Sequence, residues 1–231
     1  MQIHGLNKTT LLDYPGHIAA TIFTGGCNFR CPFCHNASLV INPASSPLIP
    51  SSEILAFLEK RKNILSGVCI TGGEPTLQPD LSMFLFEIKK MGYLIKLDTN
   101  GTNPDMITTL FQKGLLDYVA MDIKSSKNGY YDATGVTTVD LQSVESSIHF
   151  LMSATINYEF RTTLVEELHT DEEILSIGHW IKGAKAYYLQ PYKDSPDTIR
   201  RGYHTPSLEA INRFVSLLQP FVPSVKVRGI D

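Results

Sequence analysis

This sequence of 231 residues has no large excess of acidic or basic residues, no long apolar run and only a few cysteines. Each of these shortages argues against one class of protein. The 20 basic and 23 acidic residues leave a net charge of −3, so no basic excess favours nucleic acid as a partner. No apolar run reaches the roughly 18 residues that a membrane span needs. We therefore expect a cytoplasmic protein whose partners include neither nucleic acid nor a membrane.

Only four cysteines are present, and three of them, Cys27, Cys31 and Cys34, lie close together in the sequence. Disulfides are not expected, because the N-terminal residues do not resemble an apolar signal peptide and three close cysteines cannot all pair. The C-x3-C-x2-C spacing instead predicts a metal centre. Ordinary iron–sulfur cubes have four cysteine ligands, so a cube bound by three keeps one iron open for a ligand that is not protein.

Structural zinc is the main alternative at these cysteines, since three thiolates and one further ligand make a tetrahedral set. His35 or Cys69 would have to be the fourth ligand. His35 directly follows Cys34, a poor position from which to close the same tetrahedron, and the sequence holds no second cysteine pair of the kind common in zinc sites. Cys69 lies in an apolar stretch and is interpreted as a buried side chain. The spacing therefore favours a [4Fe–4S] cluster.

Short β-rich runs alternate with helical patterns along the chain. Strands are expected at residues 18–23, 68–71, 93–98, 118–122, 158–164, 186–190 and 225–227. Between them apolar residues recur with a helical period, and Ser51 or Ser52 is expected to cap a helix that begins near Glu53. Such alternation predicts right-handed βαβ units and a parallel sheet.

The predicted fold is a single α/β domain over residues 1–231, built as an open partial (β/α)6 barrel with parallel strands. A doubly wound sheet is the alternative. A closed eight-fold barrel typically needs about 250 residues, more than this chain has. The carboxyl ends of parallel strands form the active-site face of such folds, so we expect cluster and cofactor at that rim.

Polar or metal-binding residues lie at or just beyond the ends of five of the first six predicted strands, and Arg161 lies within the fifth of the six. They are the three cysteines, residues 72–75, residues 98–101, residues 121–124, Arg161 and Gln190. Because these strand ends share one edge of the sheet, the residues are expected to form one binding site.

Three pairs of these residues have a specific chemical interpretation. Gly72 and Gly73 suit either a tight turn with positive φ or a ligand lying against the backbone. Carboxylates at the ends of neighbouring strands, Asp98 and Asp122, repel unless a cation lies between them or one is protonated, although turn capping and a surface ion pair are alternatives. The remaining pair, Lys124 and Arg161, supplies positive charges that could bind a ligand carboxylate. Glu74, beside the cysteine loop, is a candidate partner for an ammonium group.

The histidines share no metal-ligand spacing with one another. Those away from the cysteines are interpreted as structural or surface residues: His4, His17, His149, His169, His179 and His204.

The combination of Cys27-x3-Cys31-x2-Cys34, the aromatic Phe33 and the run Gly-Gly-Glu-Pro at residues 72–75 resembles the radical S-adenosylmethionine superfamily. A narrower resemblance lies in residues 8–16 and 23–36. There the chain is similar to anaerobic ribonucleoside-triphosphate reductase activating proteins, which are relatives of pyruvate formate-lyase activating enzyme. The resemblance spans about residues 3 to 195, and its motifs are less specific for the activated partner than for the superfamily.

This resemblance implies the roles of several residues. Cys27, Cys31 and Cys34 would bind three irons, and the amino and carboxylate groups of S-adenosylmethionine would chelate the fourth. The residues implied at the cofactor are Phe33 near the adenine, Gly72, Gly73 and Glu74 at the amino group, Lys124 and Arg161 at the carboxylate or ribose, and Gln190 on the adenine side. A monovalent-cation site is implied at Asp98, Thr99, Asp122 and the carbonyl of Ala120. Lys193 stands where the pyruvate formate-lyase relative has a histidine near the cofactor, so that role is not carried over.

The resemblance also implies an oxidoreductase that activates a glycyl radical enzyme. The reduced cluster would cleave S-adenosylmethionine to a 5′-deoxyadenosyl radical, which would abstract a glycine Cα hydrogen from the partner, an anaerobic ribonucleotide reductase. A low-potential donor such as flavodoxin or ferredoxin would supply the electron. Partner docking is expected around Tyr130, Tyr131 and Gly135. The alternatives are a radical S-adenosylmethionine enzyme with a small-molecule substrate and a non-catalytic module that holds zinc or a cluster.

Overall fold

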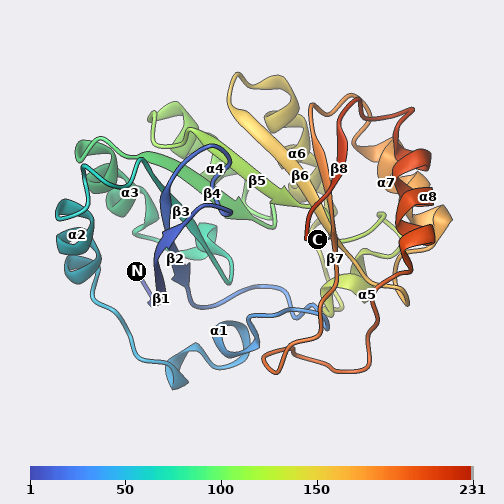
Figure 1. The fold of residues 1–231 in the computed structure, drawn as a ribbon, viewed down its shortest axis with the longest axis horizontal. Helices are drawn as coiled ribbons and strands as arrows, with labels where there is room; N and C mark the ends of the chain where they lie inside the picture. The colour runs from blue at the N-terminus through green and yellow to red at the C-terminus, as the bar shows by residue number, and fades with distance from the viewer. Residues whose placement is uncertain (230–231) are drawn as a thin grey trace. The chain divides into compact units, whose positions relative to one another are not determined.

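The computed structural model describes residues 1–229, which form an eight-stranded sheet flanked by helices (Figure 1). The strands follow one another in chain order, from β1 to β8. The first two strands pair antiparallel, whereas β2–β3, β3–β4, β6–β7 and β7–β8 pair parallel. The predicted α/β fold class with parallel strands is confirmed.

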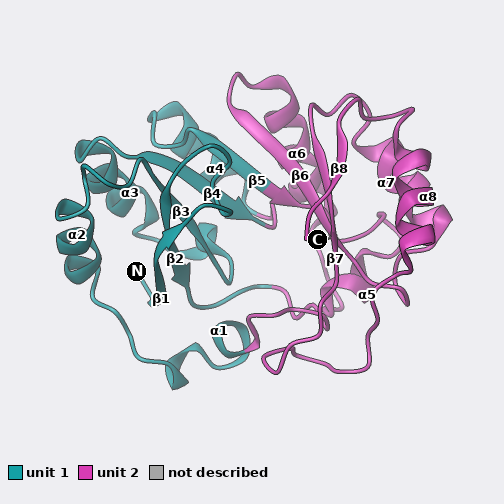
Figure 2. Cartoon of the chain, in the orientation of Figure 1, with its two compact units in different colours: residues 1–28, 38–99, 103–120 teal, residues 29–37, 100–102, 121–231 magenta. Residues whose placement is uncertain are grey.

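The chain divides into two compact units, which Figure 2 colours separately. The first consists of residues 1–28, 38–99 and 103–120, and the second of residues 29–37, 100–102 and those from 121 onward. Cys27 belongs to the first unit, and Cys31 and Cys34 belong to the second. A single domain over the whole chain remains a prediction.

The first unit is built on parallel strands that follow an antiparallel edge. Its strands are β1 (Ile3–Thr10), β2 (Ala19–Thr24), β3 (Gly67–Gly72), β4 (Leu94–Thr99) and the beginning of β5 (Tyr118–Asp122). Its helical segments are α1 (Ala37–Ile41, from residue 38 on), η1 (Pro43–Ser45), α2 (Ser51–Glu59), η2 (Pro75–Leu77), α3 (Leu81–Lys90) and α4 (Pro104–Gln112). The register of β2 against β3 pairs Thr24 with Gly72, so the two strands end side by side.

The second unit continues the alternation of helix and strand. It contains the end of β5 and then α5 (Tyr130–Thr134), α6 (Leu141–Ser153), β6 (Asn157–Leu164), α7 (Asp171–Trp180), β7 (Tyr187–Pro191), α8 (Leu208–Leu218) and β8 (Val225–Val227). Gly178 lets α7 pack against the end of α8, because a Cβ there would lie 3.2 Å from the Leu218 side chain and 2.6 Å from the Phe221 ring.

Two local features differ from the sequence prediction. Neither Ser51 nor Ser52 caps α2, since both lie inside the helix and Pro50 is its N-cap. The extended Pro50 backbone places its carbonyl where it accepts the amides of Glu53 and Ile54, so the helix begins earlier than expected. Strand β1 was not predicted, because only its first and last residues are buried and no clean alternation marks it.

Helix length bears on membrane association. Within residues 1–229 no helix is both long and apolar enough to cross a membrane.

Candidate cofactor site

The second unit holds two of the three clustered cysteines in a tight turn, where the Cys34 amide donates a 3.0 Å hydrogen bond to the Cys31 carbonyl. Neither cysteine is in a disulfide, and Cys31 is buried whereas Cys34 is half-buried. Burial raises the pKa of the Cys34 thiol, whereas the backbone of Asn36 and the ammonium group of Lys124 favour its thiolate. The turn therefore presents two sulfurs beside a fixed positive charge.

Two distant segments of the same unit hold this cysteine loop, residues 29–37, in place. The Arg30 amide donates to the carbonyl of Thr134, at the end of α5, over 2.8 Å. The Arg200 amide, in the segment between β7 and α8, donates to the Pro32 carbonyl, also over 2.8 Å. Because these bonds are made by backbone atoms, they fix the loop whichever side chains the flanking segments carry.

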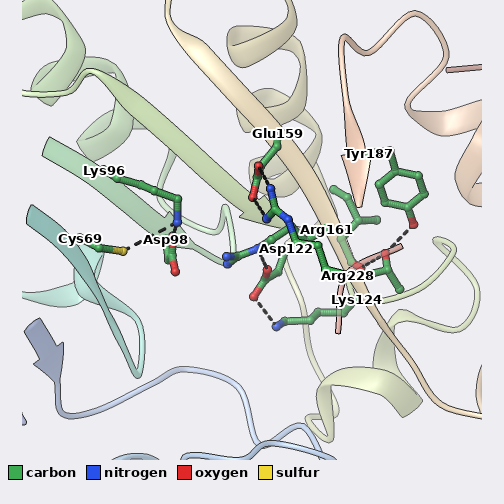
Figure 3. Close-up of polar contacts among 11 residues, drawn as sticks. Cys69, Lys96, Asp98, Asp122, Lys124, Glu159, Arg161, Tyr187 and Arg228 are labelled. Carbon is green, nitrogen blue, oxygen red and sulfur yellow. Dashed lines mark hydrogen bonds and ion pairs between the residues drawn. The ribbon is translucent and has the colours of Figure 1, made fainter. Parts of the chain in front are cut away.

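Three of the predicted site residues meet in the second unit, as Figure 3 shows. Asp122, the last residue of β5, accepts hydrogen bonds from Lys124 Nζ and from Arg161 Nε, both over 2.9 Å. Burial opposes ionisation of Asp122, but Arg161 and then Lys124 outweigh it and lower its pKa to about 2. Burial also works against the charge on Lys124, yet the carboxylate of Asp122 and the thiolate of Cys31 raise its pKa.

The sum of these charges is one excess positive charge beside the sulfurs of the cysteine loop. All three side chains are less than a third exposed, so solvent screens them only partly. The group is therefore suited to bind an anionic part of a ligand, and the binding of a ligand carboxylate by Lys124 and Arg161 remains a prediction.

Glu74 lies in the first unit and is 1% exposed. Its Oε1 accepts hydrogen bonds from the Thr76 amide over 3.0 Å, from Thr76 Oγ1 over 2.6 Å and from Thr99 Oγ1 over 2.8 Å. These donors fix the orientation of a buried carboxylate, because each compensates part of its lost hydration. Thr99, predicted as a cation ligand, thus supports Glu74.

The two glycines before Glu74 lie against the end of β2 and the residues that precede Cys27, all within the first unit. The Gly73 amide donates to the Thr24 carbonyl and the Glu74 amide to the Gly26 carbonyl, each over 2.8 Å. A Cβ on Gly73 would lie 2.0 Å from the Gly26 oxygen, and Gly72 has a φ of +116°. Close backbone packing and positive φ therefore require both glycines, and their contact with a ligand amino group remains a prediction.

Asp98 has a partner that the sequence analysis did not identify. Lys96, only 1% exposed, forms an ion pair with Asp98, and its Nζ lies 3.7 Å from Cys69 Sγ (Figure 3). Lys96 and Asp98 are two residues apart on β4 and so share one face of the strand, which is the signal that could have revealed the pair. Cys69 is completely buried, as predicted.

The remaining predicted residues lie as follows. Phe33 is buried in the cysteine loop, and Gln190 is half-buried on β7. The monovalent-cation site remains a prediction, because Asp98 and Asp122 each bind cationic side chains of their own unit.

Tyr130 is 0% exposed and so is not a docking residue, in contrast to the sequence prediction, whereas Tyr131 is 43% exposed. In the part of the chain that the structure describes, no three His, Cys, Asp or Glu side chains are gathered around the position of a single metal ion.

His169 is structural, as predicted from its lack of metal-ligand spacing. Its Nδ1 accepts the amide of Val165 and its Nε2 donates to the carbonyl of Lys124, each over 3.0 Å. Burial lowers the pKa of His169, so the neutral ring is favoured. The ring thereby anchors the backbone of a predicted cofactor residue, Lys124.

Comparison with family models matches the radical SAM superfamily to residues 21–181. A Methanocaldococcus jannaschii protein named as a glycyl-radical enzyme activating enzyme is 28% identical over 236 residues, which cover 99% of this chain and 96% of that protein. Pyruvate formate-lyase-activating enzyme of Clostridium pasteurianum is 31% identical over 140 residues, covering 58% of this chain and 57% of its own. The 7-carboxy-7-deazaguanine synthase of Neisseria meningitidis serogroup B is 34% identical over 127 residues, or 54% of this chain and 52% of that enzyme.

Solved structures share the fold at low identity. Streptococcus suis SuiB bound to precursor peptide SuiA matches with a TM-score of 0.72 and 14% identity, covering 90% of this chain and 48% of that one. The structure of anSMEcpe with bound AdoMet matches with a TM-score of 0.62 and 15% identity, covering 88% of this chain and 62% of that one. The present chain thus spans about half of the SuiB chain, and these likenesses concern the fold alone.

Proposed function

The chain belongs to the radical S-adenosylmethionine superfamily, and we propose that it is an activating enzyme that creates a glycyl radical in a partner, an anaerobic ribonucleoside-triphosphate reductase. The observation that carries the activase proposal is the end-to-end match to the Methanocaldococcus jannaschii protein named as a glycyl-radical enzyme activating enzyme. The reductase as the partner is supported by the sequence run at residues 8–16.

Enzymes of this superfamily use a [4Fe–4S] cluster and S-adenosylmethionine, and the residues present fit both groups. Three cysteines that are not in disulfides would give a cube one ligand fewer than the usual four, and the positive charges of Lys124 and Arg161 suit a carboxylate. When bound, the cluster supplies the electron that splits S-adenosylmethionine into methionine and a carbon radical. The protein supplies ligation, orientation and exclusion of competing reactions.

The chain's own residues divide this work. Cys27, Cys31 and Cys34 bind three irons. Lys124 and Arg161 hold the cofactor carboxylate or ribose, and Asp122 keeps both cations charged and in position. Because these ion pairs are already formed, the two cationic side chains need not be reoriented when the reaction occurs.

The first unit contributes the partner of the cofactor amino group. Glu74 is held in one orientation by Thr76 and Thr99, so its carboxylate can meet an ammonium group without first being ordered. Phe33 and Gln190 contact the adenine, and Asp98 with Asp122 form the cation site. A low-potential one-electron donor reduces the cluster.

The decisive experiment is anaerobic. Iron and sulfide are reconstituted, the protein is reduced, S-adenosylmethionine is added, and 5′-deoxyadenosine is measured with and without an anaerobic ribonucleotide reductase. A glycine-centred doublet in the paramagnetic resonance spectrum of the reductase is the expected result. The Cys31→Ala variant, which removes one iron ligand, is expected to give neither product.

A small-molecule substrate is the second candidate, because 7-carboxy-7-deazaguanine synthase is 34% identical over 127 residues. Cleavage of S-adenosylmethionine without a glycyl radical in the reductase would favour that candidate. No cleavage and no bound iron would exclude both.

A further inference from the structure

A pocket of about 490 Å³ lies in the second unit, formed by residues that the proposed function does not use. Its walls come from the loop after β5 and from helices α6 and α7. The lining residues that matter here are Lys127, Glu145, His179 and Trp180.

Trp180, the last residue of α7, gives the pocket an aromatic wall and is the only tryptophan of the sequence. Lys127 Nζ lies 5.2 Å from the centre of this indole ring and forms a 2.8 Å ion pair with Glu145. Because Glu145 neutralises this ammonium group, the indole is the feature that a ligand would meet. It favours a flat aromatic ring.

Three aromatic rings, those of Trp180, Tyr130 and Phe29, pack in a row from the pocket to the cysteine loop. Trp180 contacts Tyr130 edge to face, with ring centres 5.8 Å apart, and Tyr130 contacts Phe29 in the same way at 6.2 Å. Tyr130 is 0% exposed and Phe29 is 3% exposed, so no solvent separates them. Phe29 lies between Cys27 and Cys31 in the sequence.

Tyr130 is also close to the cysteines themselves. Burial raises the pKa of its phenol, the ammonium group of Lys124 opposes that rise, and the thiolate of Cys31 adds to it. Tyr130 therefore links the pocket wall to the surroundings of a proposed cluster ligand within one unit.

The proposed reaction requires an electron that this chain does not supply itself. Each reductive cleavage consumes one electron, and the sequence holds only one cysteine beyond the clustered three, too few for a second cluster. The electron must come from another molecule. Electron tunnelling weakens exponentially with distance, and packed side chains transmit it better than a solvent gap does.

We propose that the Trp180 pocket is the docking site for a protein that carries a reduced flavin, and that Trp180, Tyr130 and Phe29 form the path of its electron to the cluster. The ring system of the flavin is flat and aromatic, which suits the Trp180 indole, and in its two-electron-reduced form the flavin is an anion at neutral pH. On transfer the flavin anion loses one electron and becomes its neutral radical, the oxidised cluster gains that electron, and no proton moves. The inference rests on the proposed function only in requiring a cluster that must be reduced.

The test uses the full chain with its cluster reconstituted and a photoreduced flavodoxin as the probe. Stopped-flow absorbance follows bleaching of the cluster and formation of the flavin radical, with no glycyl radical enzyme present. We expect Trp180→Leu to slow this reduction at least tenfold and Trp180→Phe, which keeps an aromatic ring, to slow it far less. Reduction by dithionite, which needs no docking pocket, is expected to be equal in all variants.

Lys127→Glu keeps the aromatic path and tests docking alone. Its loss of an exposed ion pair costs the fold about 0–1 kcal/mol, so the variant remains folded even where Trp180→Leu does not. We expect a severalfold slower reaction with flavodoxin, while the charge-matched control Lys182→Glu, exposed and outside the pocket lining, reacts like the unaltered chain.

Equal rates with flavodoxin for Trp180→Leu, Lys127→Glu and the unaltered chain would overturn this inference, as would an unaltered chain that flavodoxin does not reduce. A chain that is reduced normally but creates no glycyl radical would instead overturn the proposed function and leave the docking site standing.

Discussion

Thr99 Oγ1 donates a 2.8 Å hydrogen bond to Oε1 of Glu74, and this bond joins the end of β4 to the turn that follows β3. Glu74 is buried, so hydrogen bonds from such donors replace those that its carboxylate would make to water. The residue proposed to meet the cofactor amino group is thus oriented by a neighbour on another strand.

Replacing Thr99 by Val is expected to weaken S-adenosylmethionine binding about tenfold and to destabilise the fold by about 1–3 kcal/mol, because a buried acceptor loses a donor. Thr99→Ser keeps the hydroxyl group and should remain close to the unaltered chain. Equilibrium dialysis and denaturant unfolding measure the two effects. Equal cofactor affinity in the Val and Ser variants would show that this hydrogen bond does not position Glu74.

Gly73→Ala is expected to reduce the iron bound per chain after reconstitution, because the added methyl group would lie 2.0 Å from the Gly26 oxygen, next to Cys27. Gly114→Ala is the control. It introduces a side chain at a φ of +66° but meets no atom within 4 Å, so it adds backbone strain without displacing Gly26. Full iron loading of Gly73→Ala would contradict the steric argument.

Arg228→Met is expected to destabilise the second unit by about 3–5 kcal/mol, since it removes two charge-assisted hydrogen bonds from a buried carboxylate. Arg228 donates two hydrogen bonds, of 2.5 and 2.7 Å, to the completely buried Glu159 (Figure 3). It also lies 3.5 Å from the centre of the Tyr188 ring. The double variant with Glu159→Gln removes the stranded charge and should recover part of the loss. Additive losses in a denaturant double-mutant cycle would argue against this coupling.

Stability is expected to fall below about pH 6.5, in part through His169. Burial lowers the pKa of His169 in the folded chain, so the unfolded chain binds the proton first as the pH decreases. The contribution of the neutral ring is thus complete above the unfolded pKa and is lost as the pH falls toward the folded pKa, by at most about 1.4 kcal/mol per pH unit. Denaturant unfolding at pH 7 and pH 5 should show a smaller loss for His169→Gln than for the unaltered chain. Identical losses would show that His169 does not titrate between the two states.

Much of the secondary structure was predictable because apolar periodicity is a local property. The expected strand at 118–122 matches β5, a short run with three consecutive buried apolar residues, and the one at 225–227 matches β8, in which apolar and charged residues alternate. The prediction failed where local signals were weak. β1 lacks a clean pattern, and the serines before Glu53 were plausible caps until the backbone of Pro50 took that place.

Covalent spacing alone establishes part of the chemistry: three cysteines in one short segment, two glycines before Glu74, and polar residues at the strand ends. Which of these groups interact depends on how the chain folds. Arg228 and Glu159 are 69 residues apart, and Thr99 and Glu74 are 25 apart, so no local pattern links them. Burial is the physical reason for such pairs, because a charge removed from water needs a partner and the folded chain determines which one is within reach.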